Sequence, residues 1–304
     1  MVSNSIIIVG SANTDMVIKA DKFPLPGETI LGGKFFMFPG GKGANQSVAA
    51  SRLGGNVTFI AKVGNDVFGK QAIQQFKKEG IRTDYIISDP DHPSGVALIT
   101  VDAKGENTIV VAQGSNGTLS PSDLIKAEKE FEHAGIVLMQ LEIPLHTVLH
   151  AARLAKEHGK KVILNPAPAM PLPSELFGNL FIITPNKSET EALTGIEITD
   201  MASIKKAAEK IREKGVINVV ITLGSEGAYI FNDEGGRHIP THKVNAIDST
   251  AAGDVFNGAL AVGIAEGQQL DDAVTFANHA AAISVTKMGA QASAPFRKEL
   301  TSIL

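Results

Sequence analysis

Short, uninterrupted runs of β-branched and other apolar residues alternate with longer amphipathic stretches along most of this 304-residue chain. Runs of this length without polar alternation are typical of strands that are covered on both faces. We expect strands at residues 6–9, 57–63, 136–139, 161–164, 180–184 and 219–223. We expect helices at residues 44–53, 68–79, 121–131, 145–158, 188–193, 204–214, 252–266, 270–287 and 297–300. The alternation predicts an α/β fold, a three-layer α/β/α sandwich with a mostly parallel central sheet.

Two segments interrupt this alternation. Residues 13–38 contain period-two fragments around a Pro-Leu-Pro-Gly turn, and residues 95–101 and 107–111 alternate on either side of a turn. We predict that they form a small β-sheet that projects from the core as a lid over a ligand, with ordinary surface hairpins as the alternative. The expected lid comprises residues 11–38 and 95–112, and the expected core comprises residues 1–10, 39–94 and 113–304.

Composition excludes several classes of function. The formal net charge is -4, so the chain has no basic surplus with which to bind nucleic acid or an anionic membrane. It contains no cysteine, which excludes disulfides, thiolate zinc sites and a thiol nucleophile. No apolar run approaches the roughly 20 residues that a membrane span needs, and we expect a cytoplasmic protein.

The segment from Asp248 to Gly258 carries the strongest chemical signal. Small residues precede an apolar helix there, and the N–H groups at such a helix start can hold an anion such as a phosphoryl group. Asp254 lies in the first turn, where a carboxylate can accept the proton of an attacking hydroxyl. The alternative is that Asp254 only stabilises the helix dipole.

A second glycine-rich turn, Pro-Gly-Gly-Lys-Gly-Ala-Asn-Gln at residues 39–46, leads into a predicted helix. The absence of side chains at its glycines lets a ligand approach the backbone. It is not a P-loop, because no Ser or Thr follows Gly-Lys, and Gln46 stands where a dinucleotide fingerprint has its third glycine. A plain helix start is an equally good interpretation of this segment alone.

Taken together, Gly40–Asn45 and Asp248–Asp254 resemble the paired signatures of the ribokinase-like (phosphofructokinase-B type) carbohydrate kinases in sequence, order and separation. The resemblance extends from about residue 6 to residue 293. It implies ATP-dependent transfer of the γ-phosphoryl group to the O5 hydroxyl of D-ribose, with Mg²⁺ accompanying ATP and K⁺ as a monovalent activator. It also implies a homodimer that forms through the lid. The alternatives are a related kinase for fructose, a sugar acid or a nucleoside, or a sugar-binding regulator without catalysis.

The resemblance also assigns expected roles to individual residues. Asp254 matches the catalytic base, and Ala251, Ala252 and Gly253 match the anion hole. The matching sugar-binding residues are Asn13, Asp15, Gly41, Lys42, Gly43, Asn45, Glu142 and Asp254. Those for ATP are Asn186, Thr222, Gly224, Ser225, Glu226, Gly227, Gly253 and Asn278. Those for the monovalent cation are Asp248, Thr250, Ser284, Lys287, Gly289 and Ser293, and Glu189 matches the residue that organises magnesium through water. Judged without the family, Asn186 and Glu189 form a helix-capping box.

Overall fold

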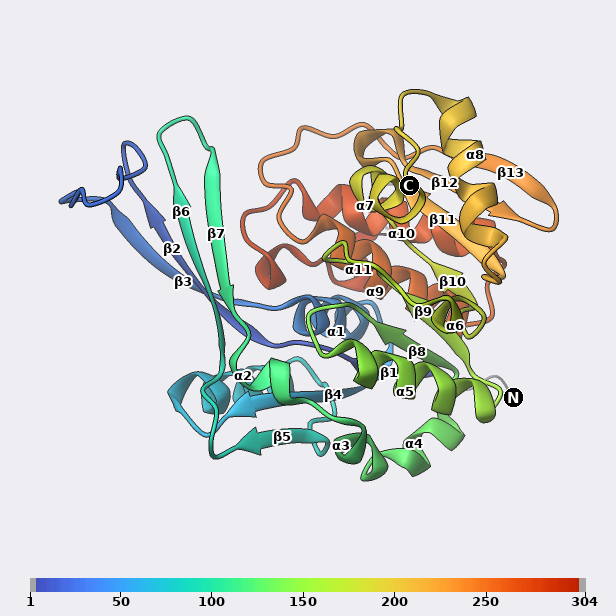
Figure 1. Cartoon of the computed structure of the whole chain (residues 1–304), viewed down its shortest axis with the longest axis horizontal. Coiled ribbons are helices and arrows are strands. Elements are labelled where there is room, and N and C mark those ends of the chain that lie inside the picture. The colour runs from blue at the N-terminus through green and yellow to red at the C-terminus, as the bar shows by residue number, and fades with distance from the viewer. Residues whose placement is uncertain (1–3, 301–304) are drawn as a thin grey trace.

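The computed structural model describes residues 4–300, which form a large sheet between two layers of helices and a smaller sheet that extends away from them (Figure 1). Nine strands make up the large sheet, in the order β13-β12-β11-β10-β9-β8-β1-β4-β5. Neighbouring strands from β11 to β5 pair in parallel, and β12 and β13 add an antiparallel edge. The strands are β1 Ser5–Val9, β4 Asn56–Gly64, β5 Ile86–Asp89, β8 Ile136–Met139, β9 Lys161–Leu164, β10 Ile182–Ile183, β11 Asn218–Thr222, β12 Ala228–Asn232 and β13 Gly235–Ile239.

The central strands have two buried faces, which explains their continuous apolar sequence. In β1, Ile6 and Ile8 enter one hydrophobic core, whereas Ile7 and Val9 enter the core on the opposite face of the sheet. The predicted three-layer α/β/α sandwich is therefore confirmed. The helices are α1 Lys42–Arg52, α2 Val67–Lys78, α3 Pro121–Ile125, α4 Glu128–His133, α5 Leu145–Glu157, α6 Ser174–Phe177, α7 Lys187–Thr194, α8 Met201–Arg212, α9 Ala252–Ala265, α10 Leu270–Ser284 and α11 Arg297–Leu300.

The small sheet has the strand order β3-β2-β6-β7, so the two interrupting segments meet as the sequence predicts. Its strands are β2 Asn13–Lys19, β3 Lys34–Gly40, β6 Gly95–Val101 and β7 Asn107–Ala112. Cross-strand partners share a face of a sheet, and the register places five large apolar side chains on one face. These side chains are between 45% and 68% exposed: Ile18, Phe35, Met37, Leu98 and Val110. We call this surface the apolar outer face.

Some predicted elements differ from the observed ones. The expected helix at 121–131 is two short helices, because the chain turns at the fully buried Ala127, whose N–H donates to the Leu124 carbonyl. In the expected strand at 180–184, only Ile182–Ile183 form β-strand hydrogen bonds with the neighbouring strands. The expected helix at 270–287 ends at Ser284. Strands β5, β12 and β13 were not predicted. Within residues 4–300, no helix is long and apolar enough to cross a membrane.

Candidate active site

The structure brings the two glycine-containing segments into direct contact. Asp254, the third residue of α9, is 7% exposed and accepts hydrogen bonds from two amides on α1. Asn45 Nδ2 lies 2.9 Å from Asp254 Oδ2, and Gln46 Nε2 lies 3.0 Å from Asp254 Oδ1. Helices α1 and α9 approach closely because Gly258 leaves no side chain between them: a Cβ there would lie 2.8 Å from the Gln46 carbonyl oxygen.

The start of α9 has the geometry of an anion-binding site. Its N-cap, Ala251, has φ 60° and ψ 13°, the one left-handed non-glycine conformation among residues 4–300. No side chain caps this helix start. The Ala252 N–H donates to the Ser249 carbonyl at 3.2 Å, and the first-turn N–H groups that follow it have no intrahelical acceptors. An acceptor from outside the chain, such as a phosphoryl oxygen, fits these donors.

The sugar-binding residues implied by the family resemblance lie around this carboxylate. Glu142, which follows β8, accepts a hydrogen bond from Ser11 Oγ at 2.5 Å and from the Lys42 N–H at 3.0 Å. Asp15 lies on β2 at the root of the small sheet. Burial, followed by the negative charges of Glu142 and Asp254, raises the pKa of Asp15 to about 6. Gly41 has φ 89°, and a Cβ there would lie 2.7 Å from the Asn13 nitrogen, so the chain itself requires glycine at this position.

Lys42 is the positive charge of the site. Burial of Lys42 disfavours its charged form, but the carboxylates of Asp254, Glu142, Glu189 and Asp15 together raise its pKa. Burial likewise raises the pKa of Asp254, while Lys42 and the two α1 amides act in the opposite direction. The site therefore holds a buried proton acceptor close to a cation that can attract phosphate.

A cavity of about 220 Å³ lies beside Glu142 and is lined by Asn13, Val111, Gln113, Asn116, Glu142 and Pro168. Sequence reasoning missed Asn116, whose side chain bonds the residues at the start of β2. Its Nδ2 donates to Asn13 Oδ1 at 2.7 Å, and its Oδ1 accepts from the Ala12 N–H at 2.9 Å. No local pattern marks Asn116, because its partners lie about 100 residues earlier in the chain.

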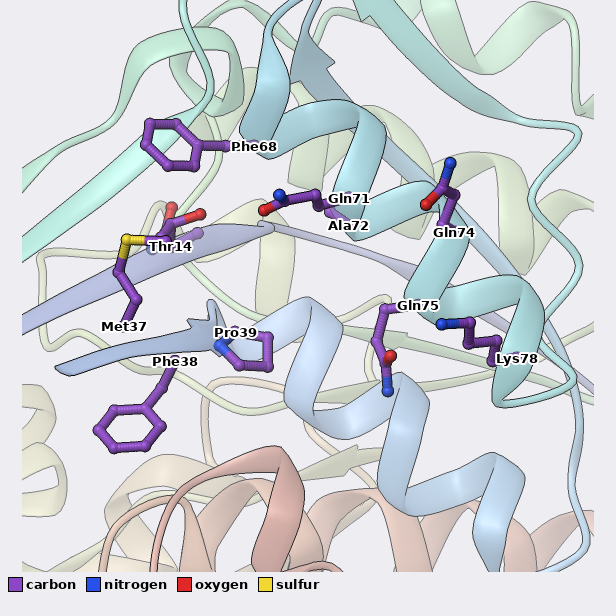
Figure 2. Close-up of a pocket in the computed structure, with 11 residues that line it drawn as sticks. Thr14, Met37, Phe38, Pro39, Phe68, Gln71, Ala72, Gln74, Gln75 and Lys78 are labelled. Atoms are coloured by element: carbon purple, nitrogen blue, oxygen red, sulfur yellow. The ribbon is translucent and has the colours of Figure 1, made fainter.

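A larger cavity, of about 320 Å³, lies between the root of the small sheet and α2 (Figure 2). Thr14, Met37 and Pro39 line it from the sheet, and Phe68 and several glutamines line it from α2 (Figure 2). Its lining contains none of the carboxylates around Lys42. The smaller cavity is lined by one of these carboxylates, Glu142, and Asp254 lines neither cavity.

The expected nucleotide residues form a second, continuous group. Asn186 and Thr222 lie side by side at the ends of β10 and β11. Gly224–Glu226 follow as a short 3-10 helix, and a Cβ at Gly227 would lie 2.2 Å from the Ile239 carbonyl oxygen. Asn278 Nδ2 donates to that same carbonyl at 3.1 Å, so its amide holds the backbone in this structure.

Asn186 and Glu189 do form the capping box that their spacing suggests. Asn186 Oδ1 accepts from the Glu189 N–H at 2.8 Å, and Glu189 Oε2 accepts from the Asn186 N–H at 2.9 Å. Glu189 is 8% exposed, and burial raises the pKa of its carboxyl group. The charge of Lys42 acts to lower the same pKa. The capping box therefore lies between the residues around Asp254 and the expected nucleotide residues.

The expected cation residues meet beside the start of α9. Asp248 accepts hydrogen bonds from the Thr250 N–H at 2.9 Å and the Gly289 N–H at 2.8 Å. Ser293 Oγ donates to the Ala290 carbonyl, and the Lys287 ammonium pairs with Glu299, so neither side chain is directed at Asp248. Among residues 4–300, no three His, Cys, Asp or Glu side chains have the geometry of a metal site. A cation here would depend mainly on carbonyl oxygens.

Comparisons with known proteins agree with this geometry. Residues 3–297 match the family model described as pfkB family carbohydrate kinase. The chain is 45% identical over 300 residues to a ribokinase from Haemophilus influenzae, covering 99% of this chain and 98% of that protein. It is 36% identical to a deoxyribokinase from Salmonella typhi, covering 98% of both. The solved structure of Arabidopsis thaliana ribokinase complexed with ribose and ATP superposes with a TM-score of 0.93 at 31% identity, covering 100% of this chain and 99% of that one. The chain belongs to the pfkB family of carbohydrate kinases.

The raised pKa of Asp15 predicts an unusual dependence of stability on pH. Well below the ordinary aspartate pKa of 3.8 the Asp15 carboxyl is protonated in both the folded and the unfolded state, whereas between that pKa and about 6 the folded state binds more protons than the unfolded state. The contribution of Asp15 to stability therefore falls as pH rises through this window, by up to about 3 kcal/mol. We expect the Asp15→Asn variant to be more stable than the parent by about 1–3 kcal/mol at pH 8 and equally stable at pH 4.

Urea unfolding of both proteins without ligands, at pH 4 and pH 8, measures this difference. If the free energies of unfolding of the two proteins differ by the same amount at both pH values, the pKa of Asp15 is not raised in the folded state.

Proposed function

We propose that this carbohydrate kinase transfers the γ-phosphoryl group of ATP to the O5 hydroxyl of D-ribose, giving ribose 5-phosphate and ADP. One observation carries the proposal: the buried Asp254 carboxylate lies at an uncapped helix start, held by Asn45 and close to the Lys42 charge. A proton acceptor, an anion site and a cation are the parts that phosphoryl transfer needs. The ribokinase and deoxyribokinase relatives favour a pentose as the acceptor.

In the proposed reaction the sugar hydroxyl oxygen attacks the γ-phosphorus in line with the departing ADP. A new O–P bond forms while the bond from the γ-phosphorus to the bridging oxygen breaks, and ADP leaves with that electron pair. Asp254 takes the hydroxyl proton. The N–H group of Gly253, and that of Ala252 once it leaves the Ser249 carbonyl, would hold the charge on the transferring group behind the Ala251 N-cap. Positioning and electrostatics supply most of the rate in reactions of this type.

We assign the sugar to the 220 Å³ cavity and the carboxylates beside it. Asp15 and Glu142 would accept hydrogen bonds from ring hydroxyls, and the Asn13 amide would offer donors. Asn45 Oδ1 is buried and has no donor within residues 4–300, and a sugar hydroxyl would satisfy it. Gly41 and Gly43 would let the sugar lie against the backbone, next to Lys42.

ATP would extend from the start of α9 across Asn186, Thr222 and the Gly224–Gly227 loop toward Asn278. Glu189 fits a magnesium ion bound through water, because it is a largely buried carboxylate with one oxygen free of the capping bond. Potassium fits the Asp248 carboxylate and the surrounding carbonyls of Thr250, Ser284, Lys287 and Gly289, with Ser293 nearby. When bound, the two cations would neutralise phosphate charge and favour anion binding at the start of α9.

We propose that residues 11–38 and 95–112 act as a lid, with Val111 of β7 closing the cavity from the lid side. A closed lid excludes water that would otherwise compete for the phosphoryl group. The apolar outer face would then pair with the same face of a second chain, because exposed apolar patches of this kind mark interfaces. Sedimentation at micromolar concentration should give the mass of a dimer, and a monomer would contradict this pairing.

A substrate panel with coupled ADP detection tests the proposed activity. D-ribose, 2-deoxyribose, fructose, a sugar acid and a nucleoside are compared with MgATP, each with and without potassium. We expect the highest kcat/KM with D-ribose and a clear increase on adding potassium. Preference for 2-deoxyribose would favour the second candidate, which the Salmonella relative supports. Absence of ADP formation with every acceptor would contradict the kinase proposal.

A further inference from the structure

The inner end of the site contains a row of buried amides that the family roles above do not use. Gln46, on α1, is fully buried, and an amide in that position costs free energy unless its donors and acceptor are satisfied. Its Nε2 donates to Asp254 Oδ1 at 3.0 Å and to Asn165 Oδ1 at 3.1 Å. Its Oε1 accepts from Gln140 Nε2 at 2.5 Å. Both hydrogens and the carbonyl of Gln46 are therefore engaged.

The partners of Gln46 come from the carboxyl ends of neighbouring parallel strands. Gln140 directly follows β8, Asn165 directly follows β9, and Asn165 Nδ2 reaches the carbonyl of Thr184, which follows β10. These strands are adjacent in the sheet. The row therefore connects three strand ends to the one carboxylate on α9. Gly10 makes room for it, since a Cβ there would lie 2.1 Å from Gln140 Oε1.

The direction of the hydrogen bonds along this row is fixed. The Thr184 carbonyl accepts from Asn165 Nδ2, so Asn165 Oδ1 faces Gln46, and the Gln46 NH₂ group must face both Asn165 and Asp254. Gln46 Oε1 then accepts from Gln140 Nε2, while Gln140 Oε1 has no partner among residues 4–300. Asn45 bonds the other oxygen of Asp254, Oδ2, and the sugar cavity is lined without Gln46. Gln46 therefore acts on the carboxylate from the protein side, away from the sugar.

We propose that Gln46 is a positioning residue for Asp254, which it orients and holds ionised, with Gln140 and Asn165 fixing the Gln46 amide in turn. This inference rests on the proposed role of Asp254 as the base. A charge-assisted bond from a fixed amide favours the ionised carboxylate, which is the form that accepts a proton. Without the Gln46 hydrogen bond, less opposes the effect of burial on Asp254, so the pKa of Asp254 rises and its protonated form persists to higher pH.

Other charges facing Asp254 stay in place when Gln46 is changed. Lys42 on α1 favours the ionised form, and three carboxylates disfavour it: Asp15 on β2, Glu142 after β8 and Glu189 on α7. Gln46 touches Asp254 directly and carries no charge itself. A change in the pH profile of a neutral Gln46 variant therefore reports the lost hydrogen bond.

The test is the pH profile of kcat for the Gln46→Met variant with D-ribose and MgATP. Methionine keeps the length of the side chain but removes both donors. We expect the midpoint of the acid limb to rise by about one pH unit, so that kcat falls about tenfold on the acid side and recovers toward alkaline pH. The KM for D-ribose should change less than about threefold, because Gln46 does not line the cavity. An acid limb that coincides with that of the parent overturns the proposal.

Asn218→Leu is the matched control. Asn218 is a buried amide at the opposite ends of the strands, bonded to the Phe181 carbonyl and to Asn232, with no link to Asp254. Its variant should lose stability and keep the parent pH profile. An equal shift in this variant would mean that the profile reports loss of packing, and would overturn the proposal.

Gln46→Glu decides the question if Gln46→Met does not give folded protein by circular dichroism. It keeps size and shape but places a second carboxyl group against Asp254, and two adjacent carboxyls cannot both ionise readily. Its acid limb should rise further than that of the methionine variant, and an unchanged limb would overturn the proposal. An active Asp254→Asn variant would instead remove the proposed base itself, whereas an inactive Asp254→Asn with an unshifted Gln46→Met would contradict only the role of Gln46.

Discussion

Replacing Asp254 by Asn is expected to lower kcat by about 10²–10⁴-fold while D-ribose still binds. The amide keeps the size of the side chain and can still contact Asn45, but it cannot accept the hydroxyl proton at neutral pH. Coupled ADP detection measures kcat, and calorimetric titration of D-ribose measures binding. We expect the dissociation constant to change far less than kcat, because the cavity residues remain in place.

The control for this variant is Asp272→Asn. Asp272 is an exposed acidic residue in the first turn of α10, so it interacts with a helix dipole as Asp254 does. If Asp254 only stabilised the start of its helix, both variants would lose a little stability and retain activity. Full activity in Asp254→Asn would therefore favour the dipole interpretation and remove the base from the mechanism.

The Gly253→Ala variant is expected to lose about 10²–10³-fold in kcat/KM without losing stability. Gly253 is the second residue of α9, and a Cβ there would meet nothing within 4 Å among the described residues. Its φ is not left-handed, so neither backbone strain nor packing requires glycine. Alanine should even favour the helix by up to about 1 kcal/mol. The methyl group would obstruct only an anion that approaches the N–H groups of the helix start.

Thermal unfolding and steady-state kinetics of Gly253→Ala separate these two effects. Gly178→Ala is the matched control, since Gly178 also has nothing within 4 Å of its Cβ position but follows α6, outside the residues assigned to ATP and sugar. That variant should keep both stability and activity. If Gly253→Ala keeps the parent kcat/KM, no phosphoryl group passes close to Gly253 and the proposed anion hole lies elsewhere.

Local sequence patterns predict what depends on neighbours along the chain. Ile6–Val9 must be a doubly buried strand because four apolar residues in succession cannot all face one core, and β1 indeed divides them between two. The alternation on either side of residues 102–105 predicts β6 and β7, because successive side chains of a strand point to opposite faces of its sheet. The edge strand β13 was missed because its Gly-Gly-Arg-His-Ile sequence is half exposed and contains few strand-forming residues.

The sequence by itself determined the sandwich, the small sheet and the two segments that carry the chemistry, because periodicity and motifs are local properties. Only the tertiary structure decided that Lys42 faces four carboxylates, that Asn116 holds Asn13, and that Gln46 bonds Asp254 across 208 positions. A buried amide or ammonium must find its partner wherever the fold places one, and the cost of leaving it unpaired is independent of separation in sequence. No local pattern records such a pairing.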